Sequence, residues 1–237
     1  MIWLFPLLGF LLGSVPFGLL LGKLKGIDIR EHGSGNIGAT NVFRTLGKGN
    51  GIFCLLLDFL KGFIPVAIAV NLCRIDDESV AVSLSFLDSW NAGFAVDQRL
   101  ASQVIPVLTA FASIMGHNYS PWIGFKGGKG IATSGGALAA LMPMGVVVLV
   151  IIFLVVTVTT KYVSVGSIAG AIVLPILTLW GSWFHGKIDD GTWNKPLFIF
   201  AVIAGAMALC KHRANIVRLR AGTENKIGSK KKKEVSV

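Results

Sequence analysis

The sequence is poor in charge, cysteine and histidine, and each shortage excludes a class of protein. Only 14% of the 237 residues are charged, whereas a soluble domain carries about 25%. Cys54, Cys73 and Cys210 are far apart and form no C-x-x-C pair, so neither a disulfide framework nor a zinc site is indicated. The chain has only four histidines and few carboxylates, which argues against a metal centre.

Apolar residues are abundant instead, at 53% of the chain with a mean hydropathy of +0.71. The run 1–22 carries no charge and is long enough to cross a bilayer as a helix, which takes about 20 residues. It has neither the basic start nor the cleavage site of a signal peptide. Further apolar segments cover residues 51–72, 103–116, 131–160, 163–181 and 196–210. We therefore expect an all-α integral membrane protein.

The distribution of Lys and Arg predicts the topology, because cytoplasmic loops are enriched in both residues. Segment 131–160 is overlong for one crossing, and Met142–Gly145 contains the Pro and Gly of a turn. Dividing it gives seven helices, with the N-terminus outside and the C-terminus inside. Seventeen of the 22 Lys and Arg residues then lie inside and four outside, with Lys61 within a helix. The acidic segment 73–102 is outside.

The net charge of +10 arises largely near the C-terminus. In a soluble protein this charge would suggest nucleic acid, but next to a membrane it indicates anionic lipid headgroups, and we expect no nucleic-acid partner. We divide the chain into a membrane domain, 1–226, and a basic cytoplasmic tail, 227–237, which we expect to be disordered. A solubilising tail without a specific role is an equally good interpretation of the lysines there.

The first polar segment on the predicted inner face, 32–41, contains G-x-G-x-x-G at Gly33, Gly35 and Gly38. A dinucleotide-binding fingerprint requires a preceding β-strand, and the membrane span in that place excludes it. Such glycines also let successive backbone N–H groups converge on an anion. We expect a phosphate site with further donors from the neutral side chains Ser34, Asn36, Thr40 and Asn41.

A short helix is expected after these glycines, capped by Thr40 or Asn41. Its N-terminus would face the glycine loop, a favourable site for phosphate. Arg44, one turn later, can bind phosphate oxygens with two parallel hydrogen bonds. The alternative is a flexible loop with an arginine that reaches the membrane surface.

The second segment, 116–133, resembles a P-loop, but the spacing is wrong because position 123 is Ile and Gly130 follows Lys129. A helix starting near Ile131 would still point its N-terminus at a glycine-rich, basic loop. The alternative is a basic flank that merely follows the charge rule. We assign to a phosphate site the residues Lys126, Gly127, Gly128, Lys129, Gly130 and Thr133, with His117 as support.

The third segment, 211–226, places His212, Asn215 and Glu224 among three arginines. A rival histidine motif, H-x-x-x-x-D at His185–Asp190, matches the His–Asp dyad of one acyltransferase superfamily, but the topology puts it outside. We therefore expect the chemistry at the inner face.

Two charges, Asp58 and Lys61, lie within an expected membrane helix, three residues apart on one face. Charged residues inside a membrane are functional candidates. An ion pair that only orients the helix explains them equally well, so we assign both to structural or site support.

Together, "GSGNIGATNVFR", "GHNYSPWIGFKGGKGIAT" and "HRANIVRLRAGTENKIG" resemble the three motifs of the bacterial membrane acyl-phosphate:glycerol-3-phosphate acyltransferases, the PlsY family. The resemblance implies transfer of a fatty acyl group from acyl phosphate to the 1-hydroxyl of glycerol 3-phosphate, the first acylation of phospholipid synthesis. It implies no metal or other cofactor, and functional coupling to an enzyme that makes acyl phosphate. It also implies a location in the cell inner membrane with the site facing the cytoplasm.

By the same resemblance, Ser34, Arg44, His212 and Asn215 act in catalysis, and Glu224 maintains structural integrity. The glycines of the second segment would belong to the glycerol-phosphate site. Segment 73–102 is longer than the family's usual loop. A transporter of a phosphorylated solute is the rival class, but it would place its polar groups near the membrane midplane.

Overall fold

The computed structural model describes residues 3–75 and 78–227, and within them the chain forms ten α-helices and four short 3-10 helices. The α-helices are α1 (Leu4–Ser14), α2 (Phe17–Leu24), α3 (Ala39–Leu46), α4 (Lys48–Leu72), α5 (Arg99–Asn118), α6 (Ile131–Leu141), α7 (Pro143–Thr160), α8 (Val163–Phe184), α9 (Lys195–Lys211) and α10 (Arg213–Arg220). The 3-10 helices are η1 (Ile29–Glu31), η2 (Ser85–Trp90), η3 (Val96–Gln98) and η4 (Pro121–Ile123). The basic tail predicted over 227–237 lies outside the described residues, apart from Ile227.

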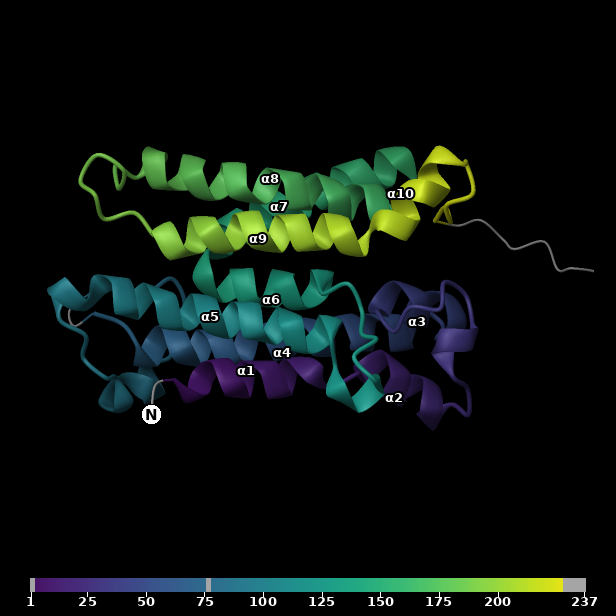
Figure 1. Cartoon of the computed structure of the whole chain (residues 1–237), viewed down its shortest axis with the longest axis horizontal. Helices are drawn as coiled ribbons and strands as arrows, with labels where there is room; N and C mark the ends of the chain where they lie inside the picture. The colour runs from purple at the N-terminus through teal and green to yellow at the C-terminus, as the bar shows by residue number, and fades with distance from the viewer. Residues whose placement is uncertain (1–2, 76–77, 228–237) are drawn as a thin grey trace, which may run out of the picture.

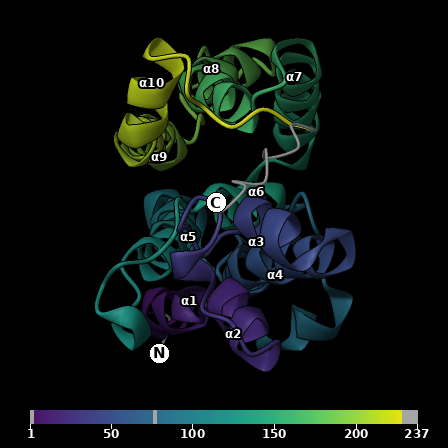
Figure 2. The ribbon, with the colours of Figure 1, turned by 90° about the vertical axis from the view of Figure 1, so that its right-hand side faces the viewer.

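The helices form two layers, α1–α5 on one side and α7–α10 on the other, with α6 between them (Figures 1 and 2). α6 packs against α4 and α5 of the first layer and against α7 of the second. The two layers are therefore joined through one short helix and through the contact of α5 with α9.

The expected membrane helices are present, but they are not seven full crossings. Five helical spans in the described residues are long and apolar enough to cross a membrane, or six if α9 and α10, bent by 53°, count as one. The predicted division of 131–160 is confirmed, since α6 ends at Leu141 and α7 begins at Pro143. α6 has only 11 residues, about 16 Å of helix against the roughly 30 Å of a bilayer core. It covers only part of the thickness (Figure 1).

The first span, Leu4–Leu24, is broken at Val15–Pro16. A residue before proline is pushed towards extended backbone, and Val15 adopts ψ 118°. The break frees carbonyl groups that cannot stay unpaired in an apolar interior. The Ser120 hydroxyl donates to the Ser14 carbonyl at 2.6 Å, and the Lys61 ammonium group donates to the Val15 carbonyl at 2.9 Å.

Glycines allow α4 and α6 to pack backbone to backbone. A Cβ atom on Gly62 would lie 2.1 Å from the Thr133 carbonyl oxygen, and one on Gly136 would lie 1.9 Å from the Phe59 carbonyl oxygen. Small residues at helix interfaces are the usual means of close packing in membranes. This contact fixes the position of α6, and with it the loop that precedes α6.

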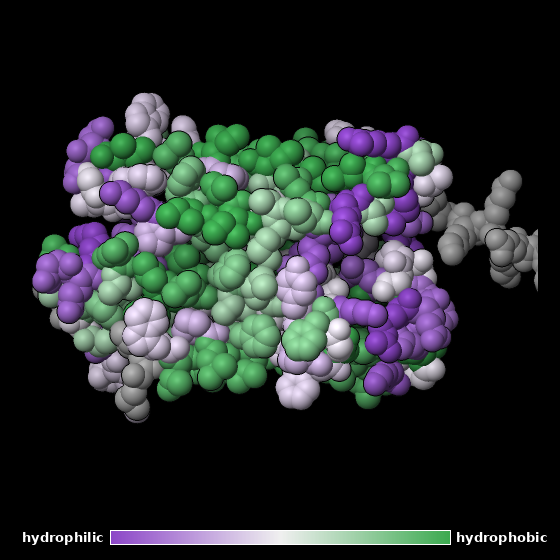
Figure 3. Space-filling model, in the orientation of Figure 1, coloured by the Kyte–Doolittle hydropathy of each residue, from purple (hydrophilic) through white to green (hydrophobic). Residues whose placement is uncertain are grey.

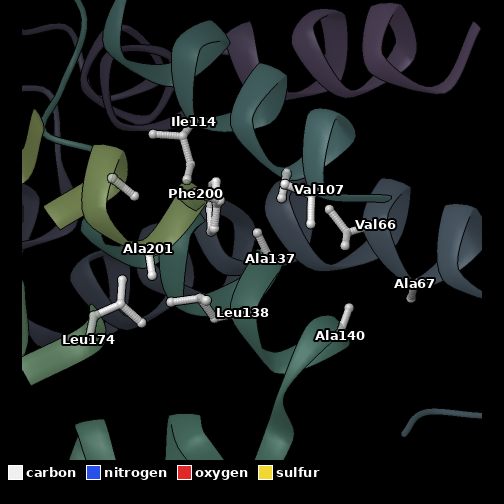
Figure 4. Close-up of a cluster of buried hydrophobic side chains, with 12 residues drawn as sticks. Val66, Ala67, Val107, Ile114, Ala137, Leu138, Ala140, Leu174, Phe200 and Ala201 are labelled. Carbon is white, nitrogen blue, oxygen red and sulfur yellow. The ribbon is translucent and has the colours of Figure 1, made fainter. Parts of the chain in front are cut away.

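The apolar core lies where α4, α5, α6, α8 and α9 meet. Figure 4 shows Phe200 of α9 between Ile114 of α5 and Leu138 of α6, with Leu174 of α8 beside Leu138. These side chains hold the second layer against the first.

Three distant segments of sequence lie at one end of the molecule. α3, the loop after α5 and α10 are all at the right-hand end of Figure 1, whereas the N-terminus and the α8–α9 loop are at the left-hand end. Figure 3 shows a predominantly apolar surface between two more hydrophilic ends. Which side of a membrane each end faces stays a prediction.

The packing of α6 against α4 makes the first testable prediction. Gly136→Ala should lower the free energy of unfolding by about 1–3 kcal/mol, because overpacking forces the two helices apart. The measurement is the midpoint of thermal unfolding in detergent micelles.

Gly135→Ala is the matched control, since its Cβ atom would meet nothing closer than 4.0 Å. Alanine has the higher helix propensity by up to about 1 kcal/mol, so this variant should be neutral or slightly stabilised. Equal transitions for the two variants would contradict the close packing.

Candidate active site

A pocket of about 330 Å³ opens where the two layers meet, among the segments gathered at the right-hand end. It is lined by residues of α3, of α4, of the turn into α6, of α8 and of the α9–α10 bend. Its cationic groups are Arg44, Lys129, Lys211 and Arg218, and its carboxylates are Asp58 and Glu224. Such a pocket is suited to an anionic ligand.

The first glycine segment is folded around the side chain of Asn41. The Asn41 Oδ1 atom accepts from the Ser34 N–H at 2.8 Å, and its Nδ2 atom donates to the Ile29 and His32 carbonyls. Gly33 and Gly35 have φ of +62° and +70°, which glycine adopts without strain. The Asn41 side chain thereby holds the loop that presents Ser34.

The expected cap of α3 by Thr40 or Asn41 is wrong. α3 begins at Ala39, with Gly38 as its N-cap and no side-chain cap. The Gly38 N–H is bound by Asn36 Oδ1 at 2.8 Å, and Asn41 is committed to the preceding loop. The first turn of α3 lines the pocket without a capping side chain, so its N-terminal N–H groups and dipole remain available to an anion.

The glycines of the second segment act differently from the prediction. The Gly127 N–H donates to the Asn118 carbonyl at 3.2 Å, and the Gly128 N–H to the His117 carbonyl at 3.1 Å. Neither N–H is free to bind phosphate. A Cβ atom on Gly128 would lie 2.1 Å from His117 Nε2, so glycine is needed here for close packing onto the end of α5.

The part of this segment that lines the pocket is the turn Lys129–Gly130 and the start of α6. Gly130, with φ of +76°, is the N-cap of α6. The α6 N-terminus therefore faces the same pocket as that of α3.

A hydrogen-bond network joins the second and third segments. Lys129 Nζ donates to Asn215 Oδ1 at 2.6 Å, and Asn215 Nδ2 donates to Glu224 Oε1 at 2.6 Å. Ser164 Oγ and Arg218 Nε also donate to the Glu224 carboxylate, at 2.9 and 2.7 Å. Because Glu224 binds the amide nitrogen of Asn215, the amide oxygen is directed at Lys129.

The pKa values of this network follow from its burial. Burial lowers the pKa of Lys129 to about 8, which Glu224 opposes and the charges of Arg218 and Arg44 reinforce. Burial raises the pKa of Glu224, but the hydrogen bonds from Asn215, Arg218 and Ser164 outweigh it and keep that pKa below its usual value. The pKa of Lys129 therefore lies close to neutral pH, so that a small rise in pH removes its positive charge.

The ring of His212 is oriented so that one of its two nitrogens can accept a proton. It is buried at the α9–α10 bend, and its Nδ1 atom lies 2.7 Å from the Ala208 carbonyl oxygen. A carbonyl can only accept, so Nδ1 carries a proton and Nε2 of the neutral ring is the free nitrogen. The ring lines the pocket.

Most of the residues predicted for the site line one pocket. These are Ser34, Asn36, Gly38, Thr40, Asn41, Arg44, Asp58, His117, Lys129, Gly130, His212, Asn215 and Glu224.

The other predicted residues do not line it. Lys126 is exposed outside the pocket, Thr133 is buried against Gly62 of α4, and Lys61 lies behind Asp58. The residues outside the pocket lining are Gly33, Gly35, Lys61, Lys126, Gly127, Gly128 and Thr133. The rival motif His185–Asp190 lies in the α8–α9 loop at the opposite end (Figure 1).

Sequence reasoning missed several lining residues, among them Ser164 and Ser167 of α8 and Lys211 of α9. A signal for the serines existed, since they are polar residues one turn apart at the start of an apolar helix. In the sequence, Lys211 contributed only to the count of Lys and Arg residues that predicts the membrane topology.

The pocket also has an apolar part of its lining. Leu55 of α4, Phe153 of α7 and Val163 of α8 belong to it, and Leu55 is half exposed. The same pocket can therefore accept an anionic group and an apolar chain.

Comparisons with known proteins agree with this chemistry. The sequence matches the glycerol-3-phosphate acyltransferase family over residues 3–222. It is 41% identical to the glycerol-3-phosphate acyltransferase of Desulforamulus reducens, over 94% of this chain and 93% of the relative. It is 40% identical to that of Thermotoga petrophila, over 95% of this chain and 96% of the relative.

The fold is similar to solved structures of PlsY (YgiH), an integral membrane glycerol 3-phosphate acyltransferase. The glycerol 3-phosphate form matches with a TM-score of 0.75 and 34% identity over 96% of both chains. The lysophosphatidic acid form matches with a TM-score of 0.73 and the same identity, over 96% of this chain and 95% of that one.

The pKa of Lys129 predicts how phosphate binding depends on pH. The ammonium form is present below about pH 8 and is lost above it. The affinity for a phosphate monoester such as ethyl phosphate should therefore fall above pH 8, by up to about tenfold per pH unit. The ligand is already a dianion there, since its second pKa is about 6. Calorimetric titration between pH 7 and 10 measures the effect.

Lys129→Arg separates Lys129 from the other cations. Arginine keeps its charge throughout this range, so the variant's affinity should be nearly constant with pH even if it is weaker. An unchanged alkaline decline in this variant would assign the titration to a different group.

Proposed function

This chain belongs to the glycerol-3-phosphate acyltransferase family, and we propose that it uses acyl phosphate as the donor and releases 1-acylglycerol 3-phosphate and inorganic phosphate. It is a multi-pass integral membrane acyltransferase. The observation that carries the proposal is that two helix N-termini, each with a cation beside it, line one pocket whose lining also includes apolar side chains. Two phosphate-bearing substrates, one with a lipid chain, match that arrangement.

The two anion sites divide between the two substrates. Lys129, the α6 N-terminus and Asn215 bind the phosphate of glycerol 3-phosphate, in agreement with the resemblance that gives the second segment to this substrate. Ser34, Arg44 and the α3 N-terminus bind the phosphate of the donor. The acyl chain of the bound donor extends past Leu55 and Phe153 into the lipid.

The reaction needs positioning more than covalent assistance, because acyl phosphate is a mixed anhydride with a good leaving group. The glycerol 1-hydroxyl oxygen attacks the acyl carbonyl carbon, and the bond from that carbon to the phosphate oxygen breaks. The hydroxyl proton is accepted by His212 Nε2 and passes to the departing phosphate. Arg44 stabilises the charge that develops on the leaving group.

A transport function fits this arrangement less well. Transporters bind their substrate near the membrane midplane between broken helices, whereas the pocket here is at one end of the helices.

The basic end of the molecule, with the pocket, faces the cytoplasm in this proposal, and the membrane is the cell inner membrane. The excess of Lys and Arg at this end supports it. A soluble supply of glycerol 3-phosphate and an enzyme that generates acyl phosphate would then meet the site from the same side.

The donor can be tested with purified protein. Palmitoyl phosphate and glycerol 3-phosphate should give lysophosphatidate without added metal and in the presence of EDTA. Activity with acyl-CoA alone, or its abolition by EDTA, would contradict the proposed donor. Product formation is followed by mass spectrometry.

Two histidine variants control this assay. His212→Ala should lower kcat at least roughly tenfold, since loss of a general base typically costs a factor of about 10² or more. His185→Ala should match the wild type. The reverse pattern would move the chemistry to the other end of the molecule.

The same proposal predicts from which side of the membrane each loop is accessible. In a chain without its own cysteines, Ser34→Cys and Ala214→Cys should react with an impermeant maleimide only from the cytoplasmic side. Asp189→Cys should react only from outside. Labelling of Ala214→Cys and Asp189→Cys from the same side would exclude this topology.

A further inference from the structure

A buried ion pair lies directly behind the pocket. Lys61 Nζ is 2.8 Å from Asp58 Oδ1 and donates to the Val15 carbonyl at the break of the first span. Both side chains are only 3% exposed. A charged pair at such a site is costly, and an apolar pair of the same size would often pack with equal stability. The pair therefore calls for an explanation beyond the orientation of α4.

Asp58 also faces the phosphate loop through His117. His117 Nδ1 lies 3.7 Å from Asp58 Oδ1, and both side chains line the pocket. His117 Nδ1 has no hydrogen-bond partner within the described residues, and the charged partner of Asp58 Oδ1 is Lys61. The distance from Nδ1 to Oδ1 is too long for a hydrogen bond, but it is short enough for the carboxylate to attract the ring when Nδ1 carries its proton.

The other edge of the imidazole supports the loop. His117 Nε2 packs against Gly128, where a Cβ atom would approach to 2.1 Å, and the His117 carbonyl accepts the Gly128 N–H. Lys129 follows directly, and its Nζ atom binds Asn215. The packing distance between this loop and the His117 ring thus determines the position of Lys129 and of the α6 N-terminus in the pocket.

We propose that Asp58 and His117 are positioning residues, in which Asp58 fixes the imidazole of His117 and the ring sets the position of the Gly128–Gly130 turn for binding of the glycerol 3-phosphate phosphate group. The ion pair with Lys61 ties Asp58 to the break in the first span. Neither Asp58 nor His117 takes part in the acyl transfer. This inference rests on the proposed function, since it assigns that substrate to the α6 end of the pocket.

The test compares Gly128→Ala in two backgrounds. In the wild-type background the added methyl group meets the ring, so KM for glycerol 3-phosphate should rise at least about tenfold with kcat changed less than about threefold. In a His117→Ala background the obstacle is gone, and Gly128→Ala should change KM by less than about threefold. The same tenfold cost in both backgrounds would show that the loop does not rest on the ring.

A second pair of variants tests Asp58. Asp58→Asn should raise KM in the wild type and have no further effect on KM in His117→Ala, because its effect passes through the ring. An effect of equal size in both backgrounds would limit Asp58 to a structural ion pair. If Asp58→Asn does not fold, Asp58→Asn with Lys61→Met removes both charges together and carries the same comparison.

His185→Ala is the matched control, with unchanged KM and kcat, and thermal unfolding in detergent gives the stability of each variant separately. If the wild type makes no lysophosphatidate, the proposed function fails. If the wild type is active and the effects of the variants are additive, only this inference fails.

Discussion

The ammonium group of Lys61 lies in the apolar interior, where an unpaired charge would not be tolerated. Asp58 neutralises it, and the Val15 carbonyl, freed by Pro16, accepts one of its hydrogen bonds. The Val15 carbonyl also accepts the Phe17 N–H at 3.1 Å, whereas Lys61 without Asp58 would be an unpaired buried cation. The contact joins the α1–α2 break to α4, and Asp58 lines the pocket together with His117.

Glycine has two distinct roles around the pocket. At Gly33, Gly35 and Gly130 the backbone enters the left-handed region, which shapes the loops before α3 and α6. At Gly62, Gly128 and Gly136 the backbone is ordinary, and the missing side chain permits contact with a neighbouring carbonyl or ring. This close packing allows the short helix α6 to lie inside the protein with its N-terminus directed at the pocket.

The chemistry of the site is assembled by polar contacts between segments that belong to different layers. Asn215 Oδ1 accepts a hydrogen bond from Lys129 and Asn215 Nδ2 donates one to Glu224, so a carboxylate in the third segment orients a cation in the second. His212 donates a hydrogen bond from Nδ1–H to the Ala208 carbonyl, which leaves Nε2 as the acceptor nitrogen. A reaction with a good leaving group needs little more than such positioned groups.

The sequence by itself determined the membrane class, the helices and their approximate bounds, because a bilayer requires long uncharged helices and leaves few alternatives. It also determined that three polar segments share one end, since crossing parity depends only on the number of helices between them. It identified Arg44, Lys129, His212 and Asn215 through residue types suited to phosphate chemistry and through the family resemblance.

The tertiary structure decided which groups are free to bind. Gly127 and Gly128 look like anion donors in the sequence, but their N–H groups are used by the carbonyls that end α5. Asn41 looks like a helix cap, but it holds the preceding loop. Ser164 of α8 and Lys211 at the end of α9 line the same pocket as Arg44 and Lys129, which are far away in the sequence. A hydrogen bond satisfied by a distant partner leaves no trace in local sequence, because the partner is chosen by packing.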